Sequence, residues 1–264
     1  MNTKEIFAEY IDHMGSDLTV VNAARASFGK ESWWADLEQR LLKNGDQGLI
    51  RYLATGYRTE EWQEFLDEIT ATVELTKGAE KDAALTELLH AYKRRPQHWA
   101  PFGHPHLQLR IQVPIFLARQ FVKHQVGGVW SEESRRYIDE EPDYWFPNEW
   151  HTRPDDIKQG SGGLATAQDK CQHDAEYATM VSLKSYKALR EKDVAPEEAR
   201  IVLTLNSMTT VVWTGSLLFW SRVCNQRVDS HAQLAAQELG RKISDIVGPR
   251  FPYSWEALTG MKAG

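Results

Sequence analysis

One segment near the middle of the chain alternates strictly between apolar and polar side chains. Residues 107–113 read LQLRIQV. Because successive side chains of a strand point to opposite faces, this alternation predicts a half-buried strand. Pro114 suits the first position of a helix, which is predicted over 115–125 and stops before the glycine pair 127–128. The chain is therefore expected to contain a sheet that is joined directly to a helix.

The remaining segments mix helices and strands in no regular order. Two segments, 17–28 and 203–213, are rich in β-branched residues and predict strands. Helical patterns are expected over the ranges 3–14, 32–54 (with a break near Gly45), 58–93, 166–192, 217–226 and 232–247. Without regular alternation, an α+β fold is expected rather than a doubly wound parallel sheet.

Two segments stand out by composition. Residues 58–93 are highly charged and interrupted at Gly78, which predicts a helical hairpin on the outside of the fold. Pro96 ends the hairpin, because the residue before proline is disfavoured in a helix. Residues 154–165, which read PDDIKQGSGGLA, predict a flexible insertion.

Charge and cysteine content exclude several classes of protein. The net charge of −6 over 264 residues argues against a nucleic-acid polymer as partner, although a small basic pocket for one phosphate remains possible. Two cysteines, Cys171 and Cys224, are too few for a disulfide framework or a Cys-rich metal site. Because an apolar run of membrane length and a signal peptide are both missing, no membrane span and a reducing cytoplasm are expected.

The first candidate site begins at the end of the predicted helix 115–125. Gln120 and His124 are four residues apart and share one face of that helix. The following segment, 130–137, reads WSEESRRY and brings a carboxylate, a hydroxyl and two guanidinium groups. Arginine forks match phosphate oxygens, and a carboxylate can accept from a sugar hydroxyl or a ring N–H. The alternative is a solvated run of charges with internal salt bridges.

The second candidate site lies near the C-terminal end of the chain. Residues 226–233 read QRVDSHAQ, and Arg222 and Arg227 belong to the helix that precedes them. Asp229 or Ser230 can cap the next helix, so a purely structural role is an open alternative.

A third group contains His98, His104 and His106. No cysteine and no HExxH spacing accompanies them, so packing or cofactor contact is favoured over a metal site. The chain also lacks the glycine-rich dinucleotide and phosphate loops and the GxSxG elbow. Neither cysteine stands in an obvious nucleophile setting.

Together these segments resemble the flavin-dependent thymidylate synthases. The family signature is Arg-His-Arg, seven variable residues and then Ser, usually followed by Arg-Tyr. Here the stretch from Lys123-His124-Gln125 to Ser134-Arg135-Arg136-Tyr137 is similar, but both signature arginines are replaced and the gap is eight residues. The resemblance points to a divergent, phage-like branch of the family.

Further matches follow in order along the chain. They are Ser27 in AARASF, His98 with Pro101-Phe102, Pro114-Ile115-Phe116 through Arg119-Gln120, Arg200-Ile201-Val202-Leu203, Trp213-Thr214, Arg227 with Asp229-Ser230-His231-Ala232-Gln233, and Tyr253-Ser254-Trp255-Glu256-Ala257. The resemblance covers roughly residues 15–55, 98–150 and 175–260. It implies one domain over residues 1–264, with 58–93 as a helical insertion.

The resemblance implies a twisted, mainly antiparallel sheet flanked by helices, and a homotetramer with shared active sites. It assigns dUMP to Gln120, Glu132, Ser134, Arg135, Arg136, Arg200 and Arg227. It assigns FAD to Ser27, His98, Ala100, Lys123, His124, Gln125, Glu132, Ser216 and Arg222. Arg227 would lie against the pyrimidine and favour its ionised form. The family usually has Glu at position 103 and Asn at position 216, where this chain has Gly103 and Ser216.

The implied reaction methylates dUMP at carbon 5, with methylenetetrahydrofolate as carbon donor and NADPH as the reductant of FAD. It needs no enzyme nucleophile, which agrees with the two unremarkable cysteines, and no metal. Three alternatives stay open: a relative that acts on UMP or dCMP or leaves a hydroxymethyl group, a non-catalytic nucleotide- or flavin-binding protein, and a plain helical scaffold. The expected location is the cytoplasm, or the host cytoplasm if the source is viral.

Overall fold

The computed structural model describes residues 1–154 and 160–262. The chain divides into two compact units. Unit 1 contains residues 1–12, 107–215 and 222–246, and unit 2 contains residues 13–106, 216–221 and the chain from Val247 onward. Each unit is therefore built from several separate stretches of the sequence.

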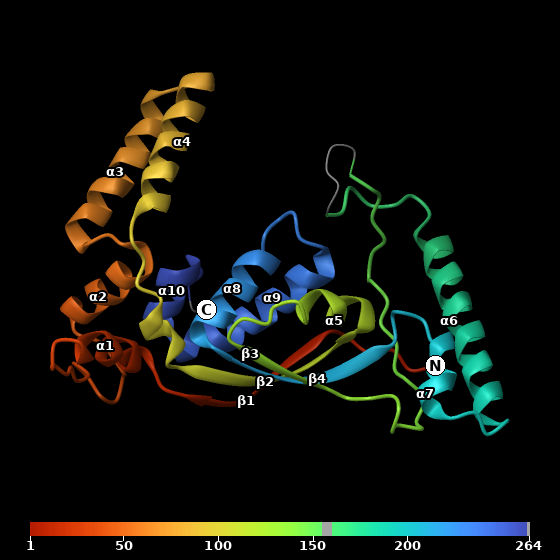
Figure 1. Cartoon of the computed structure of the whole chain (residues 1–264). Coiled ribbons are helices and arrows are strands. Elements are labelled where there is room, and N and C mark those ends of the chain that lie inside the picture. The colour runs from red at the N-terminus through yellow and green to blue at the C-terminus, as the bar shows by residue number, and fades with distance from the viewer. Residues whose placement is uncertain (155–159, 263–264) are drawn as a thin grey trace. The chain divides into compact units, whose positions relative to one another are not determined.

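A four-stranded antiparallel sheet runs through unit 1, with its strands in the order β1-β2-β4-β3 (Figure 1). Its strands are β1(Phe7–Met14), β2(His106–Pro114), β3(Gly128–Glu132) and β4(Met208–Ser216). Trp130 of β3 stands opposite Trp213 of β4, and their rings meet edge to face at 5.0 Å between centroids. Because helices flank this sheet, the expected α+β fold with a mainly antiparallel sheet is confirmed.

The helices of unit 1 follow the strands closely. They are α5(Ile115–Phe121), α6(Gln168–Arg190), α7(Pro196–Ala199), a 3-10 turn at Arg200–Val202, most of α8(Leu217–Arg227), and α9(Leu234–Val247). Leu239 and Ile243 of α9 are fully buried, as are Val223 and Cys224 of α8. A smaller core forms where Leu183 and Tyr186 of α6 pack with Tyr144 and Ala199.

Unit 2 is mainly helical. Its elements are α1(Asp17–Ala26), α2(Asn44–Thr55), α3(Thr59–Leu75), α4(Gly78–Arg94), the 3-10 turns at Ala100–Gly103 and Gly248–Arg250, and α10(Pro252–Thr259). Asp17 is buried at the start of α1 and accepts hydrogen bonds from the backbone N–H groups of Tyr253 and Ser254, at 3.0 and 2.9 Å. These bonds cap the first turn of α10 and join the two ends of unit 2.

Helices α3 and α4 run side by side as a hairpin, as the sequence predicted for residues 58–93 (Figure 1). Four rings form an aromatic cluster at its base: Tyr57, Trp62, Phe65 and Tyr92. Arg95 lies over the Tyr57 ring at 4.2 Å. The base of the hairpin is thus held by ring packing and a cation–π contact.

The first two predicted elements of the chain are wrong in type. Residues 3–14 were expected to be helical, but residues 7–14 form β1, whose Glu9 pairs with Arg110 of β2 at 2.9 Å. Pairing with a neighbouring strand therefore overrides the local helical pattern. Residues 17–28 were expected to form a strand, but they begin α1, because the Thr19 hydroxyl accepts from the backbone N–H of Ser16 at 3.0 Å and starts a helix.

Other boundaries shift. The helix expected over 32–54 is limited to α2, since residues 35–41 form an irregular loop closed by backbone bonds between Ala35 and Leu41. Leu37 is 75% exposed, so its apolar spacing does not mark a buried helix face. The helix expected over 115–125 ends at Phe121. Of the insertion expected at 154–165, residues 155–159 lie outside the described residues. No helix in the described ranges combines the length and apolar character needed to cross a membrane.

Candidate functional site

Three of the predicted site residues meet in unit 1 around the side chain of Arg227. Arg227 lies in the last turn of α8, and its Nε donates to Nε2 of His124 at 3.0 Å. Its Nη2 donates to the backbone carbonyl of Gln120 at 3.0 Å, and its guanidinium lies 5.3 Å from the centre of the Phe121 ring. The end of α5 and the residues after it therefore supply two acceptors and an aromatic face to one cation.

These contacts require His124 to be neutral. An arginine has no acceptor, so Nε2 of His124 must accept and its proton must sit on Nδ1. Burial, followed by the charge of Arg227, lowers the pKa of His124 from 6.5 to about 4. Burial also lowers the pKa of Arg227, but from an ordinary value so high that the side chain stays charged. Within the described part of the chain, no carboxylate neutralises Arg227.

A glycine on α9 sets the position of the backbone at Arg227. A Cβ atom on Gly240 would come within 2.9 Å of a Val228 methyl group and 3.4 Å of the Arg227 backbone. Glycine therefore allows α9 to approach the end of α8 closely. The Cys224 thiol, one turn before Arg227, lies 3.5 Å from the Gly240 carbonyl. Its burial raises the pKa of the thiol, which makes Cys224 a poor nucleophile.

Gln120 has a second contact through its side chain. Its amide nitrogen donates to the Gln233 side-chain oxygen at 2.5 Å. Gln233 precedes α9, so this bond connects the end of α5 to the start of α9. Of the second candidate group, Asp229 accepts from the backbone N–H of His231 at 2.8 Å, and this bond lowers the pKa of Asp229. Asp229 therefore closes a local turn and does not cap the next helix as predicted, because α9 begins only at Leu234.

The segment after β3 presents the predicted carboxylate and hydroxyl. Glu132 accepts from the Thr209 hydroxyl at 2.9 Å and from the Trp130 indole N–H at 3.1 Å. Ser134 accepts from Nε of Arg136 at 3.1 Å. Both side chains are thus oriented by neighbours, while Arg136 keeps an exposed guanidinium group.

Two further arginines predicted to contact dUMP, Arg135 and Arg200, are held separately. Nη1 of Arg135 donates to the Glu140 carbonyl at 2.6 Å, and its buried Nε has no partner among the described residues. Arg200 follows α7, and its Nε donates to the Glu197 carbonyl at 3.2 Å. Among the described residues, no hydrogen bond joins Arg200 to the other predicted nucleotide contacts.

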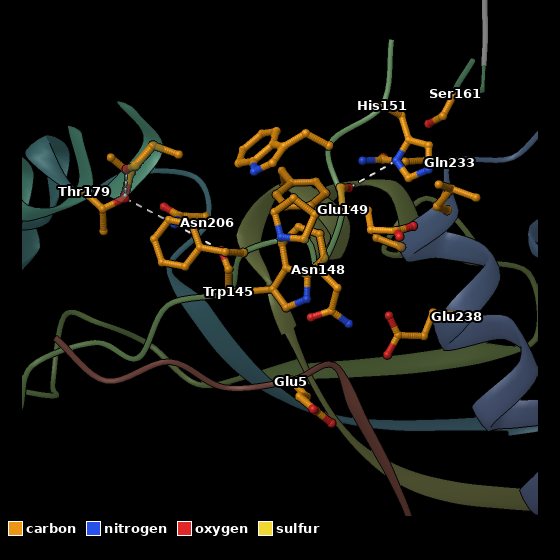
Figure 2. Close-up of a pocket in the computed structure, with 18 of the residues that line it drawn as sticks. Glu5, Trp145, Asn148, Glu149, His151, Ser161, Thr179, Asn206, Gln233 and Glu238 are labelled. Carbon is orange, nitrogen blue, oxygen red and sulfur yellow. Dashed lines mark hydrogen bonds between the residues drawn. The ribbon is translucent and has the colours of Figure 1, made fainter. Parts of the chain in front are cut away.

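Unit 1 contains a cavity of about 780 Å³ that the sequence did not predict. Figure 2 shows part of its lining, which includes the carboxylates of Glu5, Glu149 and Glu238, the Trp145 ring and the Asn148 amide. None of the predicted nucleotide or flavin contacts lines this cavity, although Gln233, the partner of Gln120, does. Three carboxylates against one lysine, Lys4, make it a poor place for a phosphate.

Unit 2 contains a cavity of about 1150 Å³, in which three predicted flavin contacts come together. Ser27 from the end of α1 lines it with His98 and Ala100 from the segment after the hairpin. Among the described residues, its lining includes Arg25, Lys30 and Arg58 and no Asp or Glu. A large cavity without carboxylates fits a group such as FAD, which carries two phosphates.

The remaining predicted flavin contacts are more dispersed. Ser216 is buried at the end of β4, and its hydroxyl accepts from the backbone N–H of Phe219 at 3.2 Å, which caps α8. Lys123, Gln125 and Arg222 have exposed side chains in unit 1. Among the described residues, no group of three His, Cys, Asp or Glu side chains is arranged to hold a metal ion.

Some functional features gave no local signal in the sequence. Gly240 comes close to the backbone of Arg227, which lies 13 residues earlier in the chain. The hydrogen bonds from Trp130 and Thr209 to Glu132 depend on strand pairing. The cationic residues Lys30 and Arg58 were not singled out, because they become neighbours of one cavity only in the fold. A count of charges per predicted element could have drawn attention to Lys30, which lies three residues after Ser27.

The chain is similar to known proteins over nearly its whole length. A family model described as "Thymidylate synthase complementing protein" matches residues 9–253. A flavin-dependent thymidylate synthase of Thermosipho africanus is 28% identical over 96% of this chain and 90% of its own length. The enzyme of that name from Kosmotoga olearia is 30% identical over 96% of this chain and 89% of its own length.

Solved structures give the same fold. The UMP/dUMP methylase PolB from Streptomyces cacaoi, bound with 5-Br dUMP, aligns with a TM-score of 0.70 and 21% identity. The alignment covers 100% of this chain and 99% of that one. Since the family model matches nearly the whole sequence, the chain belongs to the flavin-dependent thymidylate synthase family.

Proposed function

We propose that this protein is a flavin-dependent thymidylate synthase that methylates dUMP at carbon 5 to give dTMP. Methylenetetrahydrofolate is the carbon donor, and NADPH reduces the FAD. The family match over residues 9–253 supports the methyltransferase class. The named relatives support the flavin and the nucleotide.

The observation that carries the proposal is the environment of Arg227. Its charge is held by the neutral His124 ring and the Gln120 carbonyl, and no carboxylate among the described residues neutralises it. A fixed cation of this kind lowers the pKa of an adjacent acid. Placed against the pyrimidine, Arg227 favours the ring with its N3 proton removed, and this negative charge makes carbon 5 more nucleophilic.

The remaining nucleotide contacts have the chemistry that dUMP needs. Arg136, with Ser134 beside it, and Arg200 provide exposed donors for the phosphate. Glu132 accepts from the sugar or from a ring N–H, and Thr209 and Trp130 hold its carboxylate in place. Arg135 and Gln120 complete the proposed nucleotide contacts.

We assign FAD to Ser27, His98 and Ala100 in the unit 2 cavity, and to Lys123, His124, Gln125, Glu132, Ser216 and Arg222. Bound FAD supplies the transfer of hydride and of the one-carbon unit. The chain's own residues bind the substrates, orient them and supply fixed charge. No thiol attack is needed, which suits Cys224, since its burial raises the pKa of its thiol.

We further propose a homotetramer that shares its active sites between subunits. Large apolar side chains are exposed beside the predicted nucleotide contacts: Val126 (78%), Val129 (71%), Tyr137 (78%) and Ile201 (80%). Exposed apolar groups of this size favour a covering surface from another subunit.

Both cysteines are free, as in proteins of reducing compartments, and we place the enzyme in the cytoplasm.

A second candidate is methylation of UMP. The structurally similar PolB is named a UMP/dUMP methylase and has been solved with both 5-Br UMP and 5-Br dUMP. A nucleotide site that binds both ribose and deoxyribose would allow both substrates.

The test is an anaerobic assay with FAD, NADPH, methylenetetrahydrofolate and either dUMP or UMP, with products read by mass. We expect a methylated dUMP product that is lost in Arg227→Ala and kept in Arg241→Ala, which removes an exposed cation of the same unit. Turnover of UMP alone would move the function to the second candidate. A hydroxymethyl product would change the reaction, and no product with any nucleotide would contradict the enzyme proposal.

A further inference from the structure

The cavity of unit 2 has a charge distribution that the whole chain does not share. The chain has 37 acidic and 31 basic side chains, yet the described residues that line the cavity include Arg25, Lys30 and Arg58 and no carboxylate. Walls that carry one sign of charge concentrate ions of the opposite sign. The cavity is therefore built for an anionic ligand or for an anionic part of one.

One of the three cations is already neutralised. Arg25 donates through Nε to Asp46 at 3.1 Å and pairs with the same carboxylate through Nη2. Asp46 is buried, does not line the cavity, and also accepts from the Ser32 hydroxyl. Arg25 therefore serves mainly to join α1 to α2.

Lys30 and Arg58 carry the remaining charge. Within residues 1–154 and 160–262, neither of them takes part in an ion pair. Both side chains are exposed, so each can turn toward a ligand without leaving a carboxylate unpaired.

The backbone at both positions is fixed by neighbouring structure. The N–H of Lys30 donates to the Arg25 carbonyl at 3.3 Å, across a turn in which Gly29 has a φ of 62°. The N–H of Arg58 donates to the Glu61 carboxylate at 3.1 Å, and the preceding Tyr57 is buried in the aromatic cluster of the hairpin. The two cations thus start from defined points on the cavity wall.

We infer that Lys30 and Arg58 hold the diphosphate of the flavin dinucleotide, so that the helical hairpin contributes directly to cofactor binding. The inference rests on the proposed function, because it takes FAD as the ligand of this cavity. The two phosphates supply two negative charges, and the cavity offers two cations without partners. Ser27 and His98, two of the predicted flavin contacts, line the same cavity.

The experiment measures the affinity of the protein for FAD, FMN and riboflavin by flavin fluorescence. Lys30→Ala, Arg58→Ala and the double variant are compared with Lys77→Ala, a matched control at the other end of the same hairpin. Each single change should weaken FAD binding about tenfold, as expected for loss of one charge-assisted contact, and the double change about a hundredfold. Riboflavin, which has no phosphate, should bind all variants alike.

The outcomes separate the inference from the proposed function. If FAD and riboflavin weaken equally, the two residues shape the cavity and do not hold the diphosphate. If Lys77→Ala weakens FAD binding as much as Arg58→Ala does, the overall positive charge of the hairpin, and not a contact with the diphosphate, is responsible. If FAD affinity is unchanged and only the KM for NADPH or for the folate rises, the anion belongs to that cosubstrate. Each of these results overturns the inference and leaves the proposed function standing, whereas a wild-type protein without any flavin affinity overturns both.

Discussion

The positively charged side chains of the two units have different surroundings. In unit 1, Arg227 is half-buried, and its hydrogen-bond and ring partners among the described residues are neutral. In unit 2, the inner cation Arg25 is neutralised by the buried Asp46, while Lys30 and Arg58 stand exposed at the cavity. A half-buried cation with neutral partners keeps a strong field for a small reacting group, whereas exposed cations are screened and are suited to retaining a larger ligand.

Removal of the Arg227 charge should have the largest effect. In Arg227→Gln the hydrogen-bonding side chain remains polar but the cation is lost, so kcat/KM for dUMP should fall by about a thousandfold. Arg227→Lys should recover part of this loss, because it restores the charge without the planar fork. The measurement is kcat/KM against pH for the three proteins. Equal losses in both variants would mean that shape, and not charge, sets the rate.

The Asp46 carboxylate tests the other side of the comparison. Asp46→Asn removes the charge that neutralises Arg25, and we expect the free energy of unfolding to fall by about 2 kcal/mol. FAD affinity, corrected for the folded fraction, should stay the same or increase, because the cavity then gains a free cation. Urea titration and flavin fluorescence measure the two effects, with Glu31→Gln as an exposed control. A weaker flavin affinity at full stability would contradict the assignment of Arg25 to structure.

Protonation of His124 should have the smallest effect. The pKa of this ring is about 4 in the folded protein and 6.5 in its ordinary state, so the unfolded chain binds the extra proton between these values. Its contribution to stability is full above pH 6.5 and is lost progressively as the pH falls toward 4. Between pH 7 and pH 5 we expect a loss of about 1 kcal/mol, after allowance for a half-exposed ring.

Urea midpoints at the two pH values measure this loss. His124→Gln keeps an acceptor for Arg227 and removes the titration, so its midpoint should change less with pH than that of the wild type. An identical pH dependence in both proteins would show that other groups dominate, and that the neutral character of the Arg227 environment does not depend on His124.

Apolar periodicity within short segments predicted those helices and strands that are set mainly by their own sequence. Alternation in 107–113 and helical spacing in 166–192 correctly predicted β2 and α6. Gln120 and His124, expected to share one face of a helix, do not, because α5 ends at Phe121, and both instead accept hydrogen bonds from Arg227. The prediction of a helix over residues 3–14 was wrong because β1 is an edge strand, which forms by pairing with its neighbour β2. The bond from Arg227 to His124 spans 103 residues, so no spacing rule could predict it without the family resemblance.

The candidate site was therefore predictable as a set of residue types and not as an arrangement. The unit 2 cavity draws on stretches around residues 23–30, 45–59 and 97–104, which no single motif contains. The acidic cavity of unit 1 was missed for the same reason, since Glu5, Glu149 and Glu238 lie far apart in the chain.

The bond between Asp17 and α10 has a consequence for the order of events during synthesis. The N–H groups that satisfy the buried carboxylate of Asp17 belong to Tyr253 and Ser254, which follow it by 236 and 237 residues. A carboxylate buried without partners is costly, so α1 cannot settle into its final surroundings while the ribosome still holds those residues. Unit 1, which ends at Ile246, depends on less of the late chain. The packing around α1 in unit 2 is then completed only after Tyr253 and Ser254 have become available.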